Sequence, residues 1–111
     1  MPVETKTDEQ LMLEYASGNP TAFEELFRRY GKRLYNLFLR SLSKMELAQD
    51  LLQECFLRVI ESRDRYQPTK EFSSWIFTIA MNLIRDKYRQ QTHRKMESIS
   101  ESPEPEKLDS M

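Results

Sequence analysis

Five polar side chains in the C-terminal third of the chain are suited to binding a polyanion. At 100° per residue they share one face of a helix expected from about residue 72 to 95; they are Ser74, Thr78, Asn82, Arg85 and Arg89. Arginine presents a planar fork of donors to phosphate or guanine, asparagine can pair with a base edge in two ways, and hydroxyls suit phosphate or sugar contacts. The pattern alone also fits an ordinary solvated helix face.

The charge distribution favours nucleic-acid binding over the solvated face. Residues 81–95 carry five basic side chains against one acid, whereas residues 96–111 carry five acids against one lysine, within a chain whose net charge is −1. Such segregation is typical of a polyanion-binding segment followed by a solvated tail. From residue 98 onward Ser, Pro, Glu and Lys predominate without an apolar period, which is the composition of a disordered linker.

A loop is expected immediately before the polar face. Residues 66–70 interrupt the helical pattern, because Pro68 restricts the residue before it and cannot sit inside a helix. Lys70 is placed to meet phosphate, and four aromatic residues surround this region: Tyr66, Phe72, Trp75 and Phe77. Aromatic rings beside a basic groove can stack on unpaired bases. The alternative is that Phe72 and Trp75 are core residues, which we favour for Phe72, while Trp75 suits both roles.

A second polar face lies on the preceding helical segment. Asp50, Gln53 and Glu54 project from a helix whose other side carries the apolar residues, and Leu57 lies among them. Such a face is usually only solvated. An apolar side chain in the middle of it indicates instead a surface on which another protein docks.

Enzymatic chemistry is not expected. Cys55 and His93 are the single cysteine and the single histidine, whereas a structural zinc site usually needs four such ligands. A nucleophilic Cys55 would need a base, and no histidine is near it in sequence, so a small core residue is the better interpretation. The two glycines are too few for a Gly-rich phosphate cradle. We therefore expect no catalytic residue, no metal and no cofactor.

The elements that position these residues are expected to be four helices, packed as a compact all-α bundle. Thr7 with Gln10 can cap a short first helix that Gly18 ends, and Asn19-Pro20 can begin a second. Ser43 to Glu46 reads as a capping box for the third helix. Apolar residues at steps of three and four predict a buried stripe on the second helix: Phe23, Leu26, Phe27, Tyr30, Leu34, Leu37, Phe38 and Leu42.

Three segments together carry a resemblance to a known family. They read AFEELFRRY at 22–30, AQDLLQECFLRV at 48–59 and FSSWIFTIAMNL at 72–83. In this order and at this spacing they resemble conserved region two of the extracytoplasmic-function sigma factors of bacterial RNA polymerase. The resemblance covers roughly residues 8–89.

The resemblance implies one role for each polar face. In that family the helix with the Asp-Leu-x-Gln-Glu motif docks on the clamp helices of the polymerase β′ subunit, which assigns Asp50, Gln53 and Glu54, with Leu57 beside them, to polymerase binding. The loop and helix that follow recognise the minus-ten promoter element and hold a base flipped from the non-template strand. This carry-over falls on the loop from Tyr66 to Phe72, on Asn82 and on the basic positions after it. Together with the helix-face pattern, it assigns to DNA Tyr66, Lys70, Trp75, Thr78, Asn82, Arg85 and Arg89. Met81 stands where the family usually has arginine, so one basic DNA contact is missing.

The resemblance also implies further partners and a further domain. The family normally adds a helix-turn-helix domain that reads the minus-thirty-five element, and nothing after Met96 has that pattern. Residues 1–96 are therefore expected to form the region-two domain and residues 97–111 a linker toward an absent domain; we favour a truncated chain over a natural one-domain relative. An anti-sigma factor, often membrane-anchored, is a further implied partner, and the bacterial cytoplasm the implied location.

Two other functions remain open from the residues themselves. A helical adaptor that binds only protein would leave the basic segment merely solvated. A dimeric helix-turn-helix repressor is disfavoured, because no short Gly-containing turn joins two late helices. No stretch approaches about 18 consecutive apolar residues, so direct membrane insertion is not expected.

Overall fold

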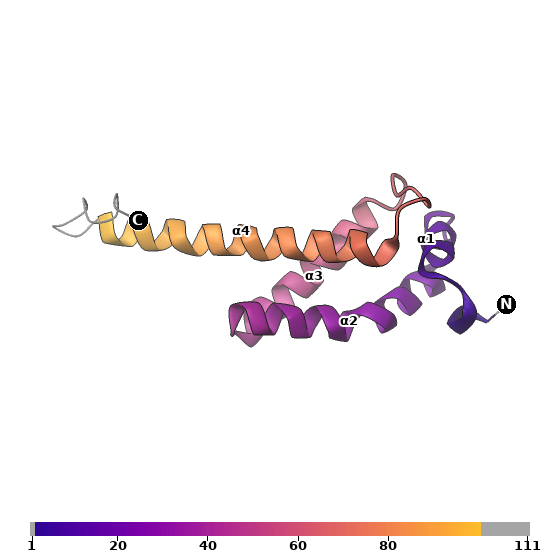
Figure 1. Ribbon diagram of the computed structural model, residues 1–111, viewed down its shortest axis with the longest axis horizontal. Helices are drawn as coiled ribbons and strands as arrows, with labels where there is room; N and C mark the ends of the chain where they lie inside the picture. The colour runs from indigo at the N-terminus through magenta and orange to yellow at the C-terminus, as the bar shows by residue number, and fades with distance from the viewer. Residues whose placement is uncertain (1, 101–111) are drawn as a thin grey trace.

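The protein is all-α, as predicted. The computed structural model describes residues 2–100, with side chains described to residue 93 (Figure 1). A short 3-10 helix η1 (Val3–Thr5) precedes α1 (Asp8–Ala16), α2 (Pro20–Leu42), α3 (Met45–Glu61) and α4 (Phe72–Ser100). α4 lies across α2 and α3, and α1 lies at the end of the bundle where α2 and α4 begin (Figure 1). Among residues 2–100, no helix is both long and apolar enough to cross a membrane.

The signals for the first two helices act as predicted. Thr7 and Gln10 form a reciprocal capping box, in which the N–H of Thr7 donates to Gln10 Oε1 at 2.8 Å and the N–H of Gln10 to Thr7 Oγ1 at 3.1 Å. Gly18 follows α1 with φ of 105°, a left-handed conformation that glycine adopts without strain. Asn19 caps α2, and Pro20 occupies its first turn.

The capping box predicted at Ser43 is wrong. Ser43 instead ends α2 in a left-handed conformation (φ 60°) and donates its backbone N–H to the Leu39 carbonyl at 2.8 Å. α3 then begins after Lys44, which makes no side-chain cap. Glu46 is therefore the second helical residue, whereas a capping box requires the third. The turn between α2 and α3 is too short for Ser43 to serve both helices.

One core joins the helices. Its largest fully buried side chains come from all four α-helices: Phe38, Phe72, Leu11, Met12, Leu26, Leu34, Ile76, Val59 and Cys55. The stripe predicted on the second helix supplies Leu26, Leu34 and Phe38 to this core, but Phe27 does not belong to it, because 44% of its surface is exposed. Ile84 of α4 is also buried.

The fourth helix continues to Ser100, five residues beyond its expected end at Lys95. Of the predicted linker at 97–111, the first four residues thus belong to α4. Residues 101–111 lie outside the described residues, so the linker and the expected domain boundary stay predictions.

Candidate functional site

The polar face of α4 is exposed along its whole predicted length. All five of its residues are exposed: Ser74, Thr78, Asn82, Arg85 and Arg89. Arg85 Nη1 donates to Asn82 Oδ1 at 3.1 Å, so these two side chains lie together. Arg89 lies 3.6 Å from a carboxylate oxygen of Asp86 in a pair that is mostly exposed, and exposed pairs contribute little free energy. Exchanging that carboxylate for a phosphate would therefore cost little.

A hollow opens at the N-terminal end of this face. It encloses about 330 Å³ and is lined by Lys70, Glu71, Ser74, Trp75 and Thr78. Three predicted DNA-binding residues meet here, whereas Asn82, Arg85 and Arg89 lie further along α4. The Ser74 hydroxyl donates to Glu71 Oε1 at 2.7 Å, which engages one oxygen of the acidic side chain in the hollow. A half-buried Trp75 indole on the wall offers an apolar surface beside the Lys70 ammonium.

Tyr66 is placed differently from the other predicted DNA-binding residues. Its side chain is buried, its ring packs at 5.0 Å from that of Trp75, and its hydroxyl donates to the backbone carbonyl of Lys70. Burial raises the pKa of Tyr66 to about 12, so the hydroxyl stays a donor at neutral pH. Tyr66 therefore braces the loop from inside, and a stacking contact with a base would require its ring to leave this packing.

The polar face of α3 borders an apolar groove. Asp50, Gln53 and Leu57 are exposed, while Glu54 is half-buried and accepts a hydrogen bond from Arg58 at 3.4 Å. The groove measures about 330 Å³, and its lining consists of Phe27, Gln49, Leu52, Gln53, Phe56, Leu57 and Ile60. Of the four predicted polymerase-binding residues, Gln53 and Leu57 line it. Asp50 and Glu54 follow Gln49 and Gln53 by one residue and so point about 100° further round the helix.

Phe27 is a groove residue that the sequence interpretation missed. Its ring packs on that of Phe56 with centroids 4.7 Å apart, while 44% of the Phe27 surface stays exposed. The ring lies over Gly31, where an added Cβ would be only 3.2 Å from Phe27 Cε1. The available signal was the glycine inside a helix four residues after an aromatic residue, because the missing side chain leaves space for the ring.

Cys55 is a core residue, as predicted. Its side chain is fully buried, and burial raises the pKa of the thiol to about 12. The thiolate, which is the nucleophilic form, is therefore strongly disfavoured at neutral pH.

Comparison with known proteins gives a family and several relatives for this chain. The family described as Sigma-70 region 2 matches residues 26–94. The RNA polymerase sigma factor CarQ of Myxococcus xanthus is 44% identical over 82 residues, which are 74% of this chain and 47% of the relative. The ECF RNA polymerase sigma factor SigE of Mycolicibacterium smegmatis is 34% identical over 104 residues, covering 84% of this chain and 40% of the relative.

A third relative is the ECF RNA polymerase sigma factor SigW of Bacillus subtilis, 33% identical over 72 residues, or 65% of this chain and 38% of the relative. The chain thus spans less than half the length of each of these relatives. The family match includes all of α3 and most of α2 and α4, the helices that carry the groove and the polar face. The chain belongs to the sigma-70 region 2 family, with extracytoplasmic-function sigma factors among its relatives.

Proposed function

We propose that this domain joins bacterial RNA polymerase core to promoter DNA, docking through the groove of α3 and reading the minus-ten element with the loop before α4 and the polar face of α4. The observation that carries the proposal is that the domain has two separate surfaces of different chemistry. One is an apolar groove with a polar rim, and the other is a basic, hydroxyl-bearing helix face that begins at a hollow. No residue lines both.

The groove suits a protein helix. Phe27 and Leu57 are each 44% exposed and lie where an apolar ridge of a partner helix would cover them. Gln53 at the edge, with Asp50 and Glu54 beyond it, supplies polar contacts around that apolar centre. An apolar centre inside a polar rim is the usual composition of a protein interface. The β′ clamp helices of polymerase are the partner that membership of the family suggests.

The face of α4 suits a melted strand. Extruding a base from a duplex costs a few kcal/mol, which stacking and edge contacts must recover. Trp75 provides a ring at the hollow, Lys70 a cation for the adjoining phosphate, and Thr78 a hydroxyl. Asn82 and Arg85 can continue the contact along the helix to the next nucleotides. We assign recognition of one base to Asn82, since its amide can pair with a base edge, and phosphate contacts to Arg85 and Arg89.

The domain needs no reaction of its own for this task. Members of the family are transcription initiation factors and not enzymes. An anti-sigma factor that covers either surface would block the function, and such a partner remains part of the proposal. The cytoplasm, where polymerase works, is the corresponding location.

The DNA half of the proposal is tested by salt dependence. Arg85→Ala and Arg89→Ala should each weaken binding to single-stranded minus-ten oligonucleotides about equally across sequences. Each should also flatten the slope of log affinity against log salt by roughly one phosphate contact. Lys32→Ala is the control, because Lys32 is an exposed cation of α2 that lines neither the hollow nor the groove. Wild-type binding that lacks a salt slope would instead support the adaptor that binds only protein.

The polymerase half is tested separately. Asp50→Ala combined with Gln53→Ala should abolish capture by polymerase core while helicity and oligonucleotide binding persist. Glu4→Ala, which removes an exposed carboxylate of η1 and none of α3, should leave capture unchanged. Normal capture of the folded double variant would refute the docking assignment.

A further inference from the structure

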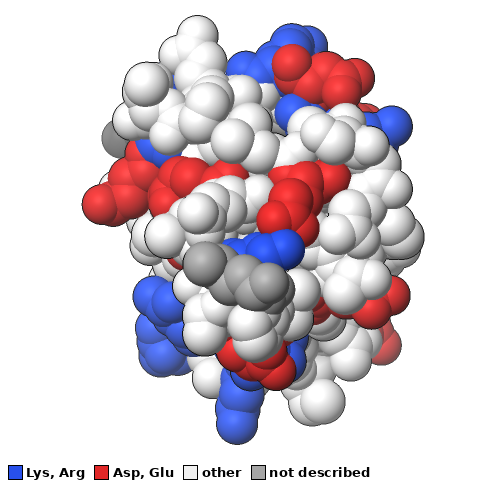
Figure 2. Space-filling model, turned by 90° about the vertical axis from the view of Figure 1, so that its right-hand side faces the viewer, with Lys and Arg blue, Asp and Glu red and all other residues white. Residues whose placement is uncertain are grey.

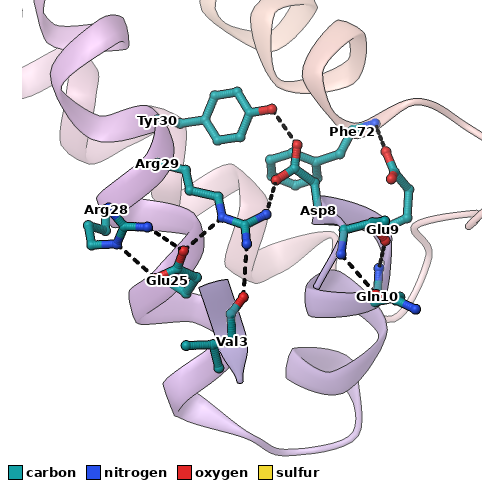
Figure 3. Close-up of polar contacts among 10 residues, drawn as sticks. Val3, Asp8, Glu9, Gln10, Glu25, Arg28, Arg29, Tyr30 and Phe72 are labelled. Atoms are coloured by element: carbon teal, nitrogen blue, oxygen red, sulfur yellow. Dashed lines mark hydrogen bonds and ion pairs between the residues drawn. The ribbon is translucent and has the colours of Figure 1, made fainter. Parts of the chain in front are cut away.

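A carboxylate of α1 caps the start of α4. Glu9 Oε2 accepts the backbone N–H of Phe72 at 2.7 Å, joining residues that are 63 positions apart in sequence (Figure 3). The first N–H groups of a helix have no partner within the helix, and negative charge is favoured at that end. Glu71, the residue directly before α4, uses a carboxylate oxygen for the Ser74 hydroxyl. Glu9 therefore supplies a cap from another helix.

The position of Glu9 is fixed by its neighbours. Asp8, next to it, accepts hydrogen bonds from Arg29 Nη1 at 2.8 Å and from the Tyr30 hydroxyl (Figure 3). Arg29 also donates to the Val3 carbonyl at 2.9 Å and to Glu25 Oε2 at 2.8 Å. This network holds η1 and α1 on the N-terminal half of α2. Because α1 cannot shift freely, the carboxylate of Glu9 presents a fixed acceptor to α4.

Phe72 transmits this contact to the loop. Its ring centroid lies 5.4 Å from that of Tyr30, 5.6 Å from that of Trp75 and 6.1 Å from that of Tyr66. The hydroxyl of Tyr66 in turn donates to the Lys70 carbonyl. Four residues of the hollow, from Lys70 to Trp75, thus belong to the loop end and the first turn that Glu9 caps.

A direct contact of Glu9 with DNA is not indicated. Figure 2 shows the end of the molecule that carries α1, where carboxylates and cationic groups are interspersed among uncharged side chains. A phosphate-binding surface would instead have predominantly positive charge. Residues 8 and 9 also lie outside the stretch 26–94 that matches the family.

We propose that Glu9 is a positioning residue for DNA recognition: by capping α4 it holds Lys70 and Trp75 in the geometry that receives an unpaired base. The inference rests on the proposed function. When the hollow is already formed, binding costs less free energy for ordering the loop, and the domain discriminates better among bases. Without the Glu9 carboxylate, the first turn of α4 frays and the hollow loses its fixed shape.

The test compares three substitutions at one position. Glu9→Ala removes the acceptor. Glu9→Asp keeps the negative charge in the first turn of α1 but withdraws the carboxylate by one methylene. Glu9→Gln retains an acceptor oxygen at full reach. Glu14→Ala is the matched control, since Glu14 is a carboxylate of α1 that pairs with Lys6 at 2.6 Å and not with α4.

Two measurements on the folded variants decide the outcome. Hydrogen exchange at the Phe72 amide should accelerate about 2- to 30-fold in Glu9→Ala and Glu9→Asp, the range that loss of a helix cap produces. Preference among single-stranded oligonucleotides varied at one minus-ten position should fall in the same two variants. Glu9→Gln and Glu14→Ala should resemble the wild type in both, and all four should bind polymerase core normally.

Failure of the role of Glu9 can be distinguished from failure of the proposed function. A wild type with a clear base preference that Glu9→Ala and Glu9→Asp retain overturns the positioning role, whatever the exchange rate. The positioning role is also overturned if Glu9→Gln shows neither the wild-type exchange rate at Phe72 nor the wild-type base preference. The acceptor oxygen would then not be what holds the hollow in shape. A wild type without any base preference overturns the proposed function itself, and this inference with it.

Discussion

Replacing Gly31 with alanine should raise stability and lower polymerase binding at the same time. Alanine in place of glycine in a helix interior stabilises by about 1 kcal/mol. The new Cβ would lie 3.2 Å from Phe27 Cε1 and 3.4 Å from Cδ1 and Cζ, closer than the ~3.5–4.0 Å that carbon atoms prefer. The ring must therefore move by a few tenths of an ångström. Because 44% of Phe27 is exposed, it can do so without opening the core.

The expected magnitudes follow from what the ring contacts. Moving the Phe27 ring sacrifices part of its contact with Phe56, and such aromatic pairs contribute ~0.5–1.5 kcal/mol. The net free energy of unfolding should rise by about 0 to 1 kcal/mol, measured by urea denaturation. Affinity for polymerase core should fall about two- to tenfold, because the displaced ring forms one wall of the groove.

A double-mutant cycle isolates the ring as the cause. In a Phe27→Leu background the leucine side chain can avoid the new Cβ. Gly31→Ala should then raise the free energy of unfolding by nearly the full ~1 kcal/mol and cause no further loss of affinity for polymerase core. If Gly31→Ala lowers stability, the ring is held more tightly than its exposure indicates. If the affinity loss is the same in both backgrounds, the substitution acts by another route and the coupling between Gly31 and the groove is refuted.

Three further outcomes are expected. Hydrogen bonds from Arg28 and Arg29 lower the pKa of Glu25 from 4.5 to about 2. The ionised carboxylate therefore stabilises the fold above pH 4.5, and this stabilisation is lost as the pH falls toward 2. In denaturant titrations Glu25→Gln should be less stable than wild type at pH 7, and the difference should shrink toward pH 2. Cys55, whose thiol pKa burial raises to about 12, should react with an aromatic disulfide reagent only when the domain is unfolded, and rapid labelling of the native protein would contradict its burial. Asn82→Ala should relax preference at one base by roughly 1–3 kcal/mol in oligonucleotide binding, whereas a uniform loss across sequences would show that Asn82 does not read a base.

The parts of the fold that the sequence predicted are those set by neighbouring residues. Thr7 with Gln10 and Asn19 with Pro20 act through contacts within one turn, and both form as expected. Ser43 shows the limit of such signals. Its motif fits a helix start, but α2 continues to Leu42, which is 8% exposed and packs in the core. The extent of α2 is thus set by tertiary packing, and the same serine becomes a helix end.

The binding surfaces were predictable only as helix faces. The spacing of apolar and polar residues shows which of them share a side of α3 or α4. The polar faces predicted in this way are largely exposed. The spacing does not show what the next helix covers, so Phe27 was assigned to the core although it lines the groove. Tyr66 was assigned to DNA because it is an aromatic residue in a loop, but its position beneath Trp75 buries it.

The contact between Glu9 and Phe72 is the extreme case of this limit, and it changes the boundary of the functional unit. No local sequence pattern relates two residues 63 positions apart. Phe72 also takes part through its backbone N–H, which every residue except proline has, so its residue type does not reveal the contact. The family match begins at residue 26, yet the helix expected to read DNA begins at a residue held from α1. A domain shortened to 26–94 would lose this cap, and it would also lose Leu11, Met12 and Ala22, which are fully buried in the core. Glu9→Ala keeps α1 in the core and removes only the cap, so it is the change that should separate base discrimination from polymerase docking.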